Sequence, residues 1–169
     1  MSGPVAEWPD FRPTELLQRL VDGGVDFVVV GGLAAVAHGS AAITRDLDIT
    51  YSPDEANLGR LGQVLVALDA RLRGVTEDVP FIPDGRTLRR TRILTLDTPD
   101  GWIDLLAQPD GAPVYERLRA GATRAEVAGV EVWIASLEDL IAMKKAVGRP
   151  KDLVAVEELE AIQRLQRGG

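Results

Sequence analysis

The chain has 169 residues, a length typical of one domain, and 46% of them are hydrophobic, which is enough to build a core. It contains no cysteine, which excludes disulfides and thiolate metal sites and leads us to expect a cytoplasmic location. The net charge of −7 argues against broad, nonspecific binding to nucleic acid. The N-terminus does not resemble a signal peptide, and we expect no membrane segment, because the apolar runs are too short to span a bilayer.

The first part of the chain alternates between turn residues and apolar runs. Residues 1–12 are polar and contain prolines, so we expect a flexible N-terminus ahead of a single domain over residues 13–166. Helical spacing of leucines predicts a helix over Thr14–Val21. A buried strand over Asp26–Val30 and a short helix over Leu33–His38 follow, on either side of two glycines.

The middle of the chain predicts a strand near Asp46–Tyr51 and a helix opening at Ser52-Pro53, where proline is favoured. Val75–Arg86 contains prolines and is expected to be irregular. The runs Thr91–Leu96 and Trp102–Ala107 flank a turn sequence and predict a hairpin.

The last part of the chain predicts a short helix over Val114–Ala120 and a strand over Val130–Ile134. Ser136 precedes acidic residues in the pattern of a helix cap. Two helices should follow, separated by Gly148-Arg149-Pro150.

Paired glycines and paired carboxylates are the most informative pattern. Gly31 and Gly32 follow a buried strand, and they allow a sharp turn and a close approach to the backbone. The free N–H groups of the helix after them would form an anion site. Asp46 and Asp48 fall on one face of their strand because side chains alternate. Two like charges repel there, and a divalent cation such as Mg²⁺ would relieve that repulsion.

The string Val30-Gly31-Gly32, thirteen residues, then Asp46-Leu47-Asp48-Ile49 resembles the nucleotidyltransferase superfamily related to DNA polymerase beta. Asp104, in Gly101–Leu106, stands where that family has a third carboxylate. The fuller glycine and alanine string resembles small members, including minimal nucleotidyltransferases and AbiEii-type toxins. The resemblance covers about Phe27 to Leu106, and a weaker similarity is present near residues 144–152.

The resemblance implies an α/β (α+β) fold, with a small mixed β-sheet flanked by helices. It implies that Asp46, Asp48 and Asp104 hold two Mg²⁺ ions, that a nucleoside triphosphate is the substrate, and that Asp104 takes a proton from the acceptor hydroxyl. The nucleotide is left open, and the acceptor could be transfer RNA, a protein or a small molecule. A toxin–antitoxin or defence context, a cognate toxin or antitoxin partner and a homodimer are further expectations.

Several cations and glycines are candidates for nucleotide binding. Gly31 and Gly32 would contact phosphate through their backbone, since no serine hydroxyl is present. Arg45 adjoins the acids, and either neutralises them or reaches the triphosphate. Lys144 continues the apolar face of its helix and Lys151 lies near the start of the next helix, so both could meet an anion, although a solvated basic turn explains them equally well.

Two other functions are open. Asp46-Leu47-Asp48-Ile49-Thr50 matches the signature of haloacid-dehalogenase-like phosphatases, but that reading leaves the glycine pair unexplained. An antitoxin or regulatory binding subunit with the same fold is the second. For the acceptor, a cluster of arginines ahead of Asp104 favours RNA over a solvated strand edge by a small margin. Its members are Arg86, Arg89, Arg90 and Arg92.

Overall fold

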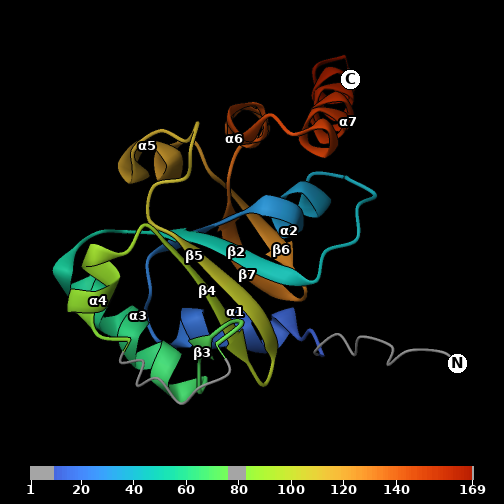
Figure 1. Ribbon diagram of the computed structural model, residues 1–169. Coiled ribbons are helices and arrows are strands. Elements are labelled where there is room, and N and C mark those ends of the chain that lie inside the picture. The colour runs from blue at the N-terminus through green and yellow to red at the C-terminus, as the bar shows by residue number, and fades with distance from the viewer. Residues whose placement is uncertain (1–9, 76–82, 169) are drawn as a thin grey trace, which may run out of the picture.

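The computed structural model describes residues 10–75 and 83–168, and Figure 1 shows their arrangement. The helices of this part are α1 (Pro13–Asp22), α2 (Gly31–Ala37), α3 (Glu55–Ala67), α4 (Gly85–Arg90), α5 (Tyr115–Ala120), α6 (Leu137–Val147) and α7 (Pro150–Arg167). Its strands are β1 (Phe27–Val30), β2 (Asp46–Tyr51), β3 (Arg71–Leu72), β4 (Ile93–Thr98), β5 (Gly101–Leu106), β6 (Thr123–Val127) and β7 (Val130–Ile134). None of the described helices is long and apolar enough to cross a membrane.

The strands form one mixed sheet in the order β3-β4-β5-β2-β1-β7-β6. Strand β2 is central, since it pairs antiparallel with β1 on one side and parallel with β5 on the other. Helices α1 and α3 lie on one face of the sheet, and α2 lies on the other with the α6–α7 hairpin beyond it (Figure 1). The expected α/β fold, a mixed sheet flanked by helices, is therefore confirmed.

Alternation along the strands decides which side chains form the core. On β2 and β5, Leu47, Ile49, Ile103 and Leu105 are fully buried. Strand β1 is buried at all four positions, because helices cover both of its faces. The other faces of β2 and β5 carry acids that are only partly exposed, so the sheet places charged groups over an apolar layer.

Most predicted elements are present, with ends shifted by one to three residues. The β4–β5 hairpin turns at Pro99-Asp100, and Ser136 caps α6 by accepting a hydrogen bond from the Asp139 N–H at 3.1 Å. Helix α2 begins at Gly31 rather than Leu33, so the glycines form its first turn.

Three elements were missed. Strands β3 and β6 are short edge strands that depend on pairing with β4 and β7. Helix α4 replaces part of the segment expected to be irregular, and Asp84 caps it by accepting from the Thr87 N–H at 2.8 Å. Val75, Pro83 and Asp84 lie outside helices and strands, as expected, whereas residues 76–82 and most of the flexible N-terminus expected over residues 1–12 lie outside the described residues. Arg12 itself is held in place, since its N–H donates to the Asp100 carbonyl at 2.8 Å.

Candidate active site

Three carboxylates meet on the partly exposed face of β2 and β5. Asp46 and Asp48 point to the same side of β2, and the parallel register sets Asp104 directly beside Asp48. One oxygen of each of the three carboxylates lies within 4.8 Å of the others. The structure thus brings together all three acids that the sequence singled out, although Asp104 lies 56 residues after Asp48.

The charges of this acid cluster are poorly compensated. Burial, followed by the charges of Asp46 and Asp104, raises the pKa of Asp48 to about 8. Burial also raises the pKa of Asp104, although the nearby Arg73 guanidinium opposes that rise. A divalent cation prefers oxygen ligands and removes this repulsion, so the three carboxylates fit a Mg²⁺ site.

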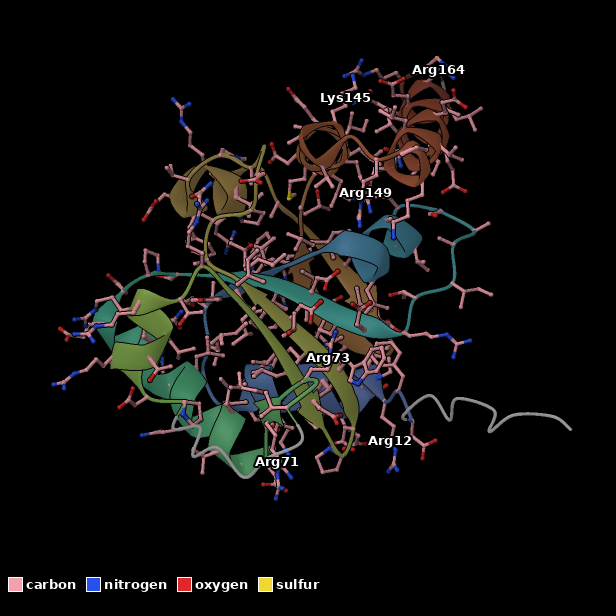
Figure 2. The ribbon with its side chains drawn as sticks, viewed as in Figure 1. Arg12, Arg71, Arg73, Lys145, Arg149 and Arg164 are labelled. Atoms are coloured by element: carbon pink, nitrogen blue, oxygen red, sulfur yellow. The ribbon has the colours of Figure 1, made fainter. Side chains whose placement is uncertain are left out.

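Arg73 is a member of the site that local sequence patterns did not indicate. It follows β3, and its Nη2 donates to Asp104 Oδ1 at 2.7 Å and to the Leu96 carbonyl at 3.2 Å. Its guanidinium lies over the Trp102 ring, 4.4 Å from the ring centroid. Figure 2 shows Arg73 close to the β4 and β5 strands, while Arg71 points away from the sheet into solvent.

The two glycines are required by the acids themselves. Gly31 has a positive φ of 66°, and a Cβ at this position would clash with the Asp48 carboxylate. A Cβ on Gly32 would lie 2.8 Å from Thr44 Oγ1, and that hydroxyl donates to the Asp46 carbonyl at 3.1 Å. The glycines therefore let the turn pack closely against the strand that carries Asp46 and Asp48.

A pocket of about 230 Å³ adjoins the acid cluster and lies between α2, α6 and α7. Gly31 and Asp48 form one side of it, and Lys144, Arg149 and Asp152 contribute charged groups. The remaining walls are mainly apolar, with Val30, Ala35, Leu106, Leu140, Met143, Val147 and Leu159 among the lining residues. Asp110 also lines the pocket, so a ligand there would meet Asp48 of the cluster, two cations and two further acids.

Asp152 holds these two cations together. Its side chain is buried, accepts from Arg149 Nε at 2.7 Å and lies 3.5 Å from Lys144 Nζ. The Arg149 hydrogen bonds lower the pKa of Asp152 to about 2. Sequence reasoning named Lys144 but neither Arg149 nor Asp152 as site residues. The sequence feature that could have indicated Arg149 and Asp152 is the turn between α6 and α7, because this turn brings the start of α7 back to α6.

Other predicted site residues lie apart from this pocket. Arg45 and Lys151 are exposed, and neither lines it. In the arginine cluster, Arg89 pairs with Glu55 at 2.7 Å and Arg92 with Asp110 at 3.7 Å. These arginines thus have acidic partners within the chain, which weakens the reason for expecting RNA.

By sequence, the chain matches no protein-family model and no curated protein. By structure, it is similar to LnuA, a lincosamide antibiotic adenylyltransferase solved with lincomycin bound. The TM-score is 0.60 at 16% identity, over 90% of this chain and 99% of that chain. ANT(2″)-Ia in complex with adenylyl-2″-tobramycin gives a TM-score of 0.54 at 17% identity, over 92% of this chain and 95% of that chain. A Thermotoga maritima protein provisionally assigned as a nucleotidyltransferase gives 0.50 at 19% identity, over 95% and 98% of the two chains.

At these identities the similarity establishes the fold. The chain has the nucleotidyltransferase fold that the sequence resemblance implied, in a form of nearly the same length as these proteins. None of the three is named as an AbiEii-type toxin, so that narrower expectation gains no support. The phosphatase alternative loses support, since it does not account for this fold or for the packing of Gly31 against Asp48.

Proposed function

We propose that this chain is an Mg²⁺-dependent nucleotidyltransferase, which moves a nucleoside monophosphate from a nucleoside triphosphate to a hydroxyl of a small-molecule acceptor. The observation that carries the proposal is the convergence of Asp46, Asp48 and Asp104. Buried like charges at this distance are costly in a protein without a ligand, and the pKa of Asp48 reflects that cost. Such a cost is expected where the resting protein is shaped to receive a cation.

The carboxylates are suited to a metal bound to triphosphate. Asp46 and Asp48 would hold it from β2, and Asp104 would complete the site from β5. Mg²⁺, when bound there, would neutralise developing charge on the phosphate oxygens and on the attacking oxygen. The expectation of two ions fits three carboxylates that share one face of the sheet.

The pocket beside Asp48 would hold the rest of the nucleotide. Lys144 and Arg149 line the same pocket as Asp48, where they would attract phosphate oxygens. The first turn of α2 starts at Gly31, and its N–H groups have no carbonyl partner within the helix. The apolar walls would receive an uncharged part of the ligand, such as the base.

The chemical step would be an in-line displacement at the α-phosphate. The acceptor oxygen forms a bond to the α-phosphorus, the bond from that phosphorus to the oxygen bridging to the β-phosphate breaks, and pyrophosphate leaves. Asp104 would accept the proton of the acceptor hydroxyl.

A small molecule is the acceptor that we favour. LnuA and ANT(2″)-Ia, two of the structural neighbours, are solved with antibiotic-derived ligands and have nearly the same length as this chain. The arginine cluster that favoured RNA is partly paired with Glu55 and Asp110. The toxin–antitoxin context, a partner protein and a homodimer remain hypotheses without an observation of their own.

The test is to incubate the purified chain with Mg²⁺ and each of the four ribonucleoside triphosphates, labelled at the α-phosphate. Tobramycin, lincomycin and purified transfer RNA are offered as separate acceptors. Transfer of label to a small molecule, with a mass increase of one nucleoside monophosphate, supports the proposal. An Asp46→Asn, Asp48→Asn double variant is the negative control. Label on transfer RNA alone would restore the RNA hypothesis. The enzymatic proposal is wrong if no triphosphate binds in the presence of Mg²⁺.

A further inference from the structure

Arg73 reaches the acid cluster from the far side of β4. Its backbone N–H donates to the Thr95 carbonyl at 3.0 Å, and Thr95 pairs with Asp104 across the β4–β5 ladder. Arg73 and Asp104 are thus two strands apart, a separation of roughly 10 Å between backbones. Only a long side chain spans that gap, and Arg73 does so with its guanidinium on the face that carries the acids, against Trp102 and Asp104.

Three contacts fix the guanidinium once it has crossed the strand. Trp102 lies against its plane, the Leu96 carbonyl accepts from Nη2, and Asp104 Oδ1 accepts from the same nitrogen. The pair is mostly buried, with side chains 25% exposed for Arg73 and 17% for Asp104. Asp104 is therefore bound through one oxygen to a group that cannot easily move.

Stability alone does not explain this arrangement. Buried ion pairs are often no better for stability than apolar residues of similar volume. Moreover, Arg73 Nε is buried without a hydrogen-bond partner, which is unfavourable. Asp104 has two acidic neighbours and, without Arg73, would tend to rotate away from them.

We propose that Arg73 is the positioning residue of Asp104: by binding Oδ1, it keeps the other carboxylate oxygen turned toward Asp46 and Asp48. This inference rests on the proposed function, because it assumes that the three acids bind a divalent cation. Residues that orient a metal-binding carboxylate in this way typically change metal affinity by about 10- to 100-fold when they are replaced. Trp102 assists by holding the guanidinium against its ring, beside Asp104.

The test is calorimetric titration of Mn²⁺ alone into the full chain without nucleotide. Arg73→Lys keeps the positive charge but loses the planar fork, so positioning predicts about tenfold weaker binding of Mn²⁺. If Arg73 acted only through its charge, Arg73→Lys would bind as the wild type does, and Arg73→Gln would bind more tightly, because a cation near the site is removed. That pair of results would overturn the inference.

Two further variants sharpen the measurement. In an Asp104→Asn background, Arg73→Lys should cause no additional loss, because Arg73 acts through Asp104; additive losses would contradict this. Arg71→Lys is the matched control, since Arg71 lies two residues earlier and its side chain pairs with the exposed Asp69, at 3.7 Å. Arg71→Lys should leave the affinity for Mn²⁺ unchanged.

If the wild type itself binds no Mn²⁺, the proposed function is wrong, and this result differs from a failure of the positioning role. Melting curves establish that each variant is folded, and Arg73→Lys is the variant to rely on if Arg73→Gln does not fold.

Discussion

Two carboxylates line the same pocket, one partly buried and one fully buried, and have opposite surroundings. Asp48 lies beside Asp46 and Asp104, and its pKa rises to about 8. Asp152 lies between Arg149 and Lys144, and its pKa falls to about 2. Both side chains come from regular elements and both are shielded from water. The difference lies in the charges that the fold brings to each of them.

The charge of Asp152 is balanced by groups of the chain itself, whereas the charge of Asp48 would be balanced by a bound ligand. Asp152 has its cations within the chain and also accepts from the Arg149 backbone N–H at the start of α7, so its role is to hold structure. The charge of Lys144 lowers the pKa of Asp48, but burial and the charges of Asp46 and Asp104 outweigh it, and the neighbouring Asp104 pairs with Arg73. A poorly compensated acid cluster beside a compensated carboxylate is what the proposed function predicts, because carboxylates with strongly raised pKa values are frequent at binding and catalytic sites.

Replacing Asp48 should give the largest effect. In Asp48→Asn, nucleotidyl transfer should fall to the background of the assay, because one of the metal-binding carboxylates is gone. The metal-free variant should melt no lower than the wild type at pH 7, since an amide is neutral without taking up the proton that Asp48, with its pKa of about 8, must bind on folding. Transfer assays and melting curves with and without Mg²⁺ check both statements. Our view of the cluster is wrong if the variant melts far below the wild type and Mg²⁺ does not stabilise either protein.

Asp104→Asn should reduce transfer by about two to three orders of magnitude, the range expected when a general base is lost. The amide still accepts a hydrogen bond from Arg73, so the fold and the binding of triphosphate should be largely retained. Single-turnover rates, compared with nucleotide affinity from calorimetry, distinguish these two effects. Normal turnover in this variant would remove Asp104 from the mechanism.

Much of the site could be predicted because its parts are local. Strand alternation and glycine turns depend only on residues that are neighbours in the sequence. The sequence alone therefore predicts the turn at Val30-Gly31-Gly32 and the shared face of Asp46 and Asp48. Asp104 was identified through its family resemblance, and the β2–β5 register then sets it beside Asp48.

The missed residues depend on long-range pairing. Arg73 reaches Asp104 only because β3 pairs with β4 and β4 with β5, and no local pattern specifies that order. The role of Gly31 was also incomplete in the sequence interpretation, which expected a phosphate to approach it. The structure shows that the Asp48 carboxylate already does so, a contact set by the β1–β2 pairing.

Gly31→Ala should test that contact. The new Cβ would clash with the Asp48 carboxylate, and the positive φ of 66° is unfavourable for alanine by about 1–2 kcal/mol. We expect both a lower melting temperature and weaker binding of Mg²⁺. Gly59→Ala is a suitable control, because Gly59 lies within α3 and a Cβ there meets nothing within 4 Å. Equal, small effects for the two variants would show that Gly31 only makes a turn.

A comparison of Lys144 and Lys151 tests whether the pocket binds the triphosphate. Lys144→Gln should raise the KM for Mg²⁺-triphosphate by about tenfold, the size of one hydrogen bond to a charged group. Lys151→Gln should have no effect, since Lys151 is exposed and does not line the pocket. Initial rates at varied triphosphate concentration decide between them. If Lys151 proves the more sensitive, the nucleotide lies elsewhere.

The last test is the dependence of stability on pH, where the two carboxylates act in opposite directions. Asp48 has a pKa of about 8 in the folded chain and an ordinary value of 3.8, so the folded state binds more protons between these values. The free energy of unfolding should therefore fall as pH rises from about 4 to 8 in metal-free protein. Asp152, with a folded pKa of about 2, stabilises the chain above 3.8, and this stabilisation is lost as pH falls toward 2.

Stability of the metal-free chain should accordingly be greatest near pH 4 to 5, between the two titrations. Melting temperatures measured in EDTA across this range would show the maximum. Mg²⁺ should flatten the decline above it, because the bound cation takes the place of the protons. Asp48→Asn should flatten the decline in melting temperature above the maximum even without Mg²⁺. Asp152→Asn should change the melting temperature only at pH values below the maximum. A melting temperature that rises steadily from pH 4 to 8 in EDTA would mean that the acid cluster is balanced by charges within the chain, and the contrast with Asp152 would then disappear.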